Sequence, residues 1–229
     1  MIDFGALGTA RLRDMLEAGM QVVECHRALA RTGDNIVGEL LPRDDTFYQF
    51  DHCPPGDIYD TQTHSQFYYH AHREGEHGHF HTFMRQRGMP EGVAPVEQSV
   101  AGDMKDREDT LSHIVAISMS QRGLPIGLFT TNRWVTAENW YAAPDVCAMI
   151  DRFRIDHAQP SWPVNLWISA MIRLFRPQIE ALLHERDAVM ADWKKQHPGE
   201  DVFEDRELDL PSHMEISVDD QIRAVQAAL

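Results

Sequence analysis

Histidine is concentrated in one short stretch of the chain, FYYHAHREGEHGHFHTF, which runs from residue 67 to residue 83. Five of these residues are histidines, and they form two groups with a spacing of two: residues 70 and 72, then residues 77, 79 and 81. Side chains two positions apart point to the same face of a β-strand. Because neutral imidazole is a preferred nitrogen ligand of divalent transition metals, the spacing predicts a metal site carried by strands.

The same stretch predicts a β-hairpin whose turn is centred on Glu74-Gly75. In such a hairpin the numbers of paired residues sum to 149, and directly opposed residues share a face of the sheet. One face then carries imidazole rings and a phenol, whereas the other face is aromatic and suits packing against a helix. The pairs that define the two faces are His72 with His77, His70 with His79, Tyr68 with His81, and Tyr69 with Phe80.

We predict that the metal ligands come from both strands of this hairpin: His70, His72, His79 and His81. Glu76 and Tyr68 are the predicted catalytic groups, because a carboxylate and a phenol beside the ligands can orient them or carry protons. The donor set favours iron or zinc, and copper, manganese and nickel also accept such ligands. The sequence leaves open whether three further histidines join the site: His64, His77 and His113. The alternative interpretation of the stretch is a solvated or pH-sensitive surface.

Part of this stretch, HAHREGE from residue 70 to residue 76, resembles the opening of the cupin metal motif, in which His-X-His is soon followed by Glu. The resemblance implies His70, His72 and Glu76 as metal ligands. It is partial, since Phe83 stands where the motif has a glycine. The longer run FYYHAHREGEHGHFHTFMR resembles a segment of an uncharacterised bacterial protein family, and that resemblance implies no activity.

A second group of aromatic and basic residues lies in TTNRWVTAENWYAAP, from residue 130 to residue 144. Arg133 and Trp134 are the predicted cofactor-binding residues, since a guanidinium and an indole can hold a carboxylate or an aromatic ligand. The alternative is that they are core and interface anchors. The sequence contains neither a glycine-rich phosphate loop nor a GxSxG motif, so nucleotide binding and serine hydrolase chemistry are not indicated.

The favoured functional interpretation is a metal-dependent enzyme of the non-haem iron or zinc type, which acts on a small molecule through a mononuclear site. The alternative is a non-catalytic metal- or haem-binding protein for storage, delivery or sensing. A third interpretation is a structural or partner-binding protein without metal. Catalysis predicts one enclosed site with an open coordination position, whereas storage predicts several exchangeable ions on an exposed strip.

Charge narrows the choice of partners. The formal net charge is −15 for 229 residues, and such an acidic surface repels phosphate backbones and anionic bilayers. We therefore expect neither nucleic acid nor membrane as a partner, but a small-molecule substrate or a metal ion, and a homo-oligomer stays open. The three cysteines are far apart in the sequence, and charged residues interrupt the N-terminal segment before a long apolar run can form. Both features favour a cytoplasmic protein.

The expected elements come in blocks along the chain. These are a helix over residues 9–31, a strand-rich block over 45–138, a helical block over 144–197 and an acidic, loop-like tail over 198–229 with one last short helix. Segregated blocks are typical of an α+β fold. We expect a single domain over residues 1–229, with an antiparallel sheet of two or more hairpins packed against N-terminal and C-terminal helices. TFYQF and LFTTNRWVTAE are further strand candidates, and Pro177 is expected to separate two helices.

Overall fold

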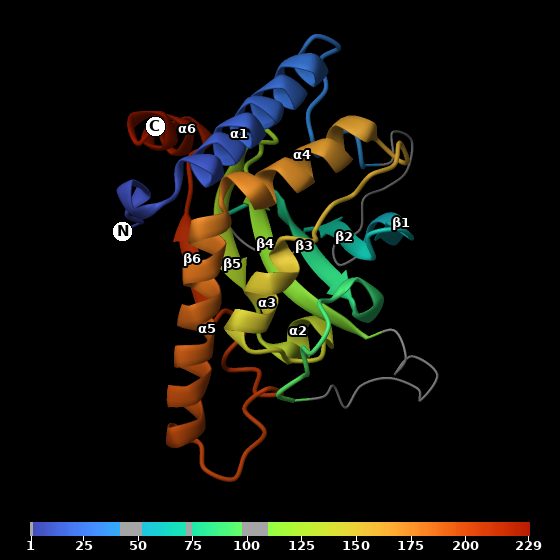
Figure 1. Ribbon diagram of the computed structural model, residues 1–229. Coiled ribbons are helices and arrows are strands. Elements are labelled where there is room, and N and C mark those ends of the chain that lie inside the picture. Colours follow the sequence, from blue (N-terminus) through green and yellow to red (C-terminus); the bar gives the residue numbers. More distant parts are fainter. Residues whose placement is uncertain (1, 42–51, 72–74, 98–109) are drawn as a thin grey trace.

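The computed structural model describes residues 2–41, 52–71, 75–97 and 110–229. Its centre is a six-stranded antiparallel sheet whose strands lie side by side in chain order (Figure 1). The strands are β1 (Cys53–Tyr59), β2 (Ser65–His70), β3 (Gly78–Arg85), β4 (Leu111–Met119), β5 (Pro125–Thr130) and β6 (Ser212–Glu215). The helices are α1 (Thr9–Ala30), α2 (Arg133–Thr136), α3 (Ala143–Ile150), α4 (Trp162–Leu174), α5 (Arg176–Gln196) and α6 (Val218–Ala227), with short 3-10 turns at Phe4–Ala6 and Gln86–Gly88. The expected α+β fold is confirmed.

The helices gather on one face of the sheet. Figure 1 shows α3 and α4 lying over the strands, α1 crossing beside α4, and α5 running along β6. The aromatic side chains that β2 and β3 turn toward these helices are fully buried, and the ring of Phe80 lies 5.3 Å from that of Trp167 on α4. Because strand side chains alternate, the histidines of the same two strands project from the opposite face.

The pairing of β2 with β3 fixes which residues share a face. The observed partners run from Ser65 with Met84 to His70 with His79, so their numbers sum to 149 as expected. A slip of one residue would turn the imidazoles into the hydrophobic core and the aromatic rings out of it. The alternation of Phe67 and Tyr69 with Tyr68 and His70 therefore selects this register.

The helices follow the sequence pattern closely. Buried residues of α1 recur at three- and four-residue steps, among them Leu12, Met15 and Val22, and the helix ends one residue short of the expected position. Pro177 lies in the first turn of α5, where the absence of a backbone N–H has no cost. It thereby separates α4 from α5, as expected. Within the described residues, the helices lack the length and hydrophobicity that a bilayer-spanning segment needs.

The segment LFTTNRWVTAE was expected to be a strand, and this expectation is wrong for the residues after Thr130. Strand β5 starts earlier, at Pro125, and ends at Thr130. The side chain of Asn132 then accepts a hydrogen bond from the backbone N–H of Arg133 and starts the one-turn helix α2, which Ala137 ends in the left-handed conformation. A local cap has overridden the strand propensity of the valine and threonine residues in this segment.

The acidic tail was expected to be loop-like before its last helix, and it contains strand β6. This strand pairs with β5, and the hydroxyl groups of Thr130 and Ser212 are hydrogen-bonded at 2.7 Å. A four-residue strand next to proline carries too little periodicity to be recognised in the sequence. The strand candidate TFYQF lies outside the described residues.

A glycine at the start of β3 tests how closely the hairpin is packed. A Cβ atom added to Gly78 would lie 2.5 Å from the carbonyl oxygen of His70 and 2.5 Å from the hydroxyl oxygen of Tyr69. We predict that Gly78→Ala lowers the free energy of unfolding by about 1–3 kcal/mol, because β2 and β3 must separate to make room. Urea denaturation measures the change.

The matched control is Gly127→Ala in β5, where an added Cβ would make only ordinary contacts at 3.5 Å or more. We expect this variant to remain within about 0.5 kcal/mol of the wild-type protein. Equal effects of the two substitutions would contradict the close packing described at Gly78.

Candidate metal centre

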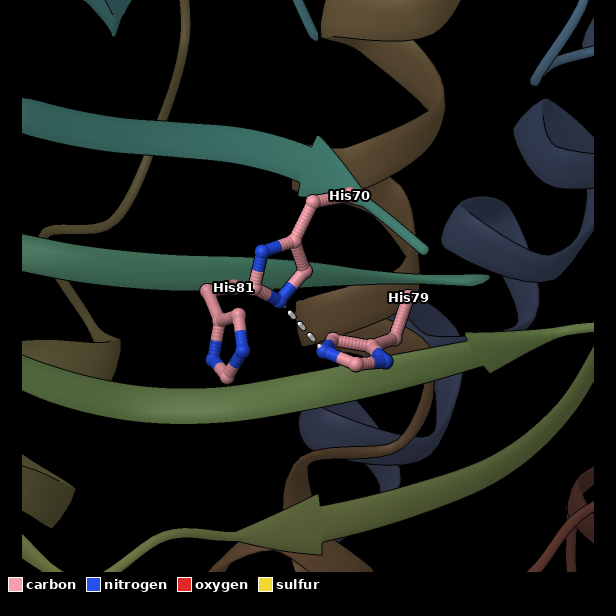
Figure 2. A group of neighbouring side chains, drawn as sticks. All are labelled: His70, His79 and His81. Carbon is pink, nitrogen blue, oxygen red and sulfur yellow. Dashed lines mark hydrogen bonds between the residues drawn. The ribbon is translucent and has the colours of Figure 1, made fainter. Parts of the chain in front are cut away.

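Three histidine rings converge on the sheet face opposite the helices (Figure 2). His70 ends β2, and His79 and His81 lie on β3. One ring nitrogen from each residue lies within 4.8 Å of the other two, and the Nε2 atoms of His70 and His79 are 2.7 Å apart. The residues are only 9%, 1% and 0% exposed. We call these three residues the histidine triad.

A buried carboxylate orients one member of the triad. The Nδ1 atom of His79 is hydrogen-bonded to the carboxylate of Glu76, whose side chain is 6% exposed. An ionised carboxylate only accepts hydrogen bonds, so Nδ1 carries the proton and, in a neutral ring, Nε2 keeps its lone pair. A carboxylate behind a ligating imidazole is a common feature of metal sites, where it fixes the ring and raises its basicity.

A second imidazole backs His81. Its Nδ1 atom lies 3.0 Å from Nε2 of His113 on β4, and Nδ1 of His113 lies 3.3 Å from the hydroxyl oxygen of Thr131. The backbone N–H of His113 donates to the carboxylate of Glu138 at 2.5 Å. On its other side, Nε2 of His81 is buried and has no hydrogen-bond partner in the described part of the chain.

Burial sets the protonation of these groups. It lowers the pKa of His81 well below its usual value, and the neighbouring His113 and His79 add to the effect. Burial also lowers the pKa of His113 to about 3, with Arg186 contributing, and raises the pKa of Glu138 to about 7. Both His81 and His113 are therefore neutral at physiological pH, and neutral imidazole is the form that binds a metal ion.

The nitrogens of the triad lie near the spacing that one ion requires. Zinc–nitrogen distances are near 2.0–2.1 Å, so tetrahedral ligand nitrogens lie about 3.3 Å apart. The Nε2 atoms of His70 and His79 would separate slightly from their present 2.7 Å to reach this spacing. Three protein ligands leave at least one position of a four-coordinate ion for water or another ligand.

Tyr68 lies directly beside the triad, as the hairpin pairing predicts. Its ring centroid is 5.3 Å from that of His70 and 5.1 Å from that of His81. The ring of His52 stacks on it at 3.7 Å, and Nδ1 of His52 is 2.8 Å from the carboxylate of Asp57. Burial raises the pKa of the Tyr68 hydroxyl, so it is a neutral phenol near the triad.

The remaining predicted residues lie elsewhere or outside the described chain. His72, a predicted ligand, is outside the described residues. His64 and His77 are hydrogen-bonded to the hydroxyl groups of tyrosines, at 2.5 Å and 2.6 Å, and are not members of the triad.

Arg133 and Trp134, the predicted cofactor-binding residues, contact the segment from residue 201 to residue 208. Arg133 is paired with Asp201 and Glu204, and the indole N–H of Trp134 donates to the carbonyl oxygen of Leu208. The structure does not group them with the triad, and their role in binding a cofactor stays a prediction.

Sequence reasoning missed two neighbours of the site, His52 and Thr131. Each lies in a different part of the chain from the hairpin, and neither carries a motif or a periodic spacing. Only the pairing of β1 with β2 and the end of β5 bring them to this face of the sheet. His113, in contrast, could be suspected, because it lies in the run LSHIVAISM, whose many β-branched residues are typical of a strand.

A cavity of about 760 Å³ lies elsewhere, on the helical side of the molecule, and contains no member of the triad. Five arginines line it, and four of them are paired with carboxylates: Arg173 with Asp14, Arg11 and Arg176 with Glu180, and Arg154 with Asp156. The pair of Arg173 with Asp14 joins α4 to α1, and the pair of Arg11 with Glu180 joins α1 to α5. We therefore regard the triad, and not this cavity, as the candidate site.

Comparison with known proteins identifies a family but no activity. The model of a protein family described as a domain of unknown function (DUF6969) matches residues 16–216, which is most of the chain. No curated protein and no solved structure matches. The expected similarity to an uncharacterised family thus gains support, whereas the partial similarity to the cupin motif gains none.

The neutral state of His113 gives a testable pH dependence in the metal-free protein. An unfolded histidine has a pKa of about 6.5, whereas the folded value is about 3, so between these values only the unfolded chain binds the proton. The free energy of unfolding therefore falls as the pH falls through this range. We predict that the wild-type protein loses about 1.4 kcal/mol per pH unit more than His113→Phe, measured by urea denaturation from pH 6.5 to pH 4.

Glu138 does not disturb this comparison, because its raised pKa contributes equally to both proteins. Unfolding free energies that fall in parallel for the two proteins would mean that His113 is protonated in the folded state, contrary to its burial.

Proposed function

The chain belongs to the DUF6969 family, and we propose that it binds one divalent transition metal ion through His70, His79 and His81 and uses this ion as an enzyme acting on a small molecule. The observation that carries the proposal is the convergence of three buried ring nitrogens within 4.8 Å. Iron and zinc suit a set of neutral nitrogen ligands best, and copper, manganese and nickel are also compatible with it.

The buried Nε2 atom of His81 supports a bound ion. A buried polar atom without a partner costs about 1–3 kcal/mol, and Nε2 of His81 is such an atom within the described residues. Three imidazoles in mutual contact also cannot all be protonated, because like charges repel in a buried site. A divalent ion would accept the lone pairs of all three ring nitrogens, so that no ring would need to be protonated.

Enclosure supports catalysis over storage. The triad is a single compact group of buried side chains, whereas storage would favour several exposed sites that exchange their ions. With three protein ligands, a bound ion would have an open position for a small molecule, where it would act as a Lewis acid or activate water or dioxygen. We propose that Glu76 orients His79 and that the hydroxyl of Tyr68 serves as a proton carrier or hydrogen-bond donor beside this position.

Metal content provides the direct test. We predict that the protein, expressed without an affinity tag, retains about one equivalent of a transition metal after dialysis, as measured by elemental analysis. His79→Ala should lose at least nine tenths of this metal, because it removes the ligand that Glu76 orients.

The control is His184→Ala, an exposed histidine on α5, which should retain the wild-type metal content. No metal in the wild-type protein, even after incubation with Zn²⁺ or with Fe²⁺ under anaerobic conditions, would refute the proposal. Several weakly held equivalents that survive His79→Ala would favour storage instead.

The carboxylate behind His79 should tune affinity without being a ligand. We predict that Glu76→Gln raises the dissociation constant for Zn²⁺ by roughly 10- to 100-fold, because the ring of His79 is less basic and less firmly oriented without the negative charge. Competition with a chromophoric chelator measures the constant. Glu185→Gln, an exposed carboxylate on α5, serves as the control, and an equal effect in both variants would contradict the assigned role.

A further inference from the structure

The two nitrogens of His81 have different surroundings. Nδ1 is hydrogen-bonded to His113, which is in turn hydrogen-bonded to Thr131. Nε2 has no partner in the described chain, and it lies on the side of the ring that faces His70 and His79 (Figure 2). His81, His113 and Thr131 are at most 1% exposed, so bulk water does not complete their hydrogen bonds. The direction of the hydrogen bonds that link His81, His113 and Thr131 therefore determines whether Nε2 of His81 carries a lone pair or a proton.

Two directions are consistent with neutral rings. In the first, Nδ1–H of His81 donates to Nε2 of His113, and Nδ1–H of His113 donates to the hydroxyl oxygen of Thr131. In the second, every bond is reversed: the hydroxyl of Thr131 donates to His113, and His113 donates to His81. The first direction leaves a lone pair on Nε2 of His81, and the second leaves an N–H there.

The first direction is favoured because it avoids a buried donor without an acceptor. Buried N–H groups without a partner are rarer in proteins than under-satisfied acceptors. An N–H on Nε2 would also point at the triad, where it would block a cation. We propose that His113 and Thr131 are positioning residues that hold His81 in the tautomer with its proton on Nδ1 and its lone pair directed at the triad.

The proposal deepens the proposed metal site and depends on it for its functional meaning. Under this proposal His79 and His81 share one tautomer, with the proton on Nδ1. His79 donates from Nδ1 to Glu76, and His81 donates from Nδ1 to His113. The two acceptors differ in charge, because Glu76 is a carboxylate and His113 a neutral ring. Loss of either acceptor should weaken metal binding without removing a ligand.

The first experiment examines the metal-free protein. Two-bond ¹H–¹⁵N correlation spectra of the protein labelled with ¹⁵N-histidine distinguish a protonated ring nitrogen from one with a lone pair. We expect His81 and His113 to be protonated at Nδ1, with the signals assigned by their loss in His81→Ala and His113→Phe. Protonation of His81 at Nε2 would overturn the proposal, whether or not the protein binds metal.

The second experiment measures the affinity for Zn²⁺ by competition with a chromophoric chelator. His113→Phe keeps a ring of similar size but has no acceptor, and we expect the dissociation constant to rise roughly 10- to 100-fold. His113→Gln offers an amide oxygen near the position of Nε2 and should restore most of the affinity. His64→Phe, which removes a histidine outside the triad, is the control and should leave the constant unchanged.

Thr131→Val and Thr131→Ser extend the test to Thr131, the last residue in this series of hydrogen bonds. Both substitutions change the size of the side chain very little. We expect Thr131→Val to weaken Zn²⁺ binding several-fold and Thr131→Ser to leave it unchanged, and this pair decides the matter if His113→Phe does not fold. Unchanged affinity in folded His113→Phe and in Thr131→Val would refute the positioning role. A wild-type protein that binds no metal but shows the expected tautomers would instead refute the proposed function alone.

Discussion

The register between β2 and β3 is the constraint on which the candidate site depends. In both strands, residues that face the triad alternate with aromatic residues that face the helices. A single pairing therefore both completes the core and assembles the triad. Burial of apolar surface on the other side of the hairpin stabilises this arrangement, because the rings of Phe67, Tyr69 and Phe80 are fully buried. Their burial holds His70 and His79 opposite each other in a site that would not form from the imidazoles alone.

Burying several imidazoles is unfavourable unless each polar atom finds a partner. The fold provides these partners from different elements: Glu76 precedes β3, His113 lies on β4, and Thr131 follows β5. Glu76 is hydrogen-bonded to Nδ1 of His79, and His113 is hydrogen-bonded to Nδ1 of His81. Thr131 is hydrogen-bonded to His113 in turn. The Nε2 atoms of His70 and His79 lie 2.7 Å apart, and Nε2 of His81 is on the side of its ring that faces them (Figure 2).

Much of this arrangement could be predicted from the sequence, because the strongest signals are local. The alternation within residues 67–83 fixed the hairpin and its pairing, and the apolar periodicity of residues 9–31 indicated the first helix. Long-range features could not be predicted in this way. The hydrogen bond between His113 and Thr131 depends on the order of strands, and β6 is too short to show a period. The cap at Asn132 shows the converse case, in which one side chain overrides a strand-like composition.

The late position of β6 in the chain has a consequence for synthesis. Thr130 and Ser212, which join β5 to β6, are separated by 82 residues. At about 5–20 residues per second, a ribosome needs roughly 4–16 seconds to translate this interval. During that time β5 is an open sheet edge on the nascent polypeptide, able to pair with other chains. Premature termination before residue 212 would make this exposure permanent and leave the fragment prone to aggregation.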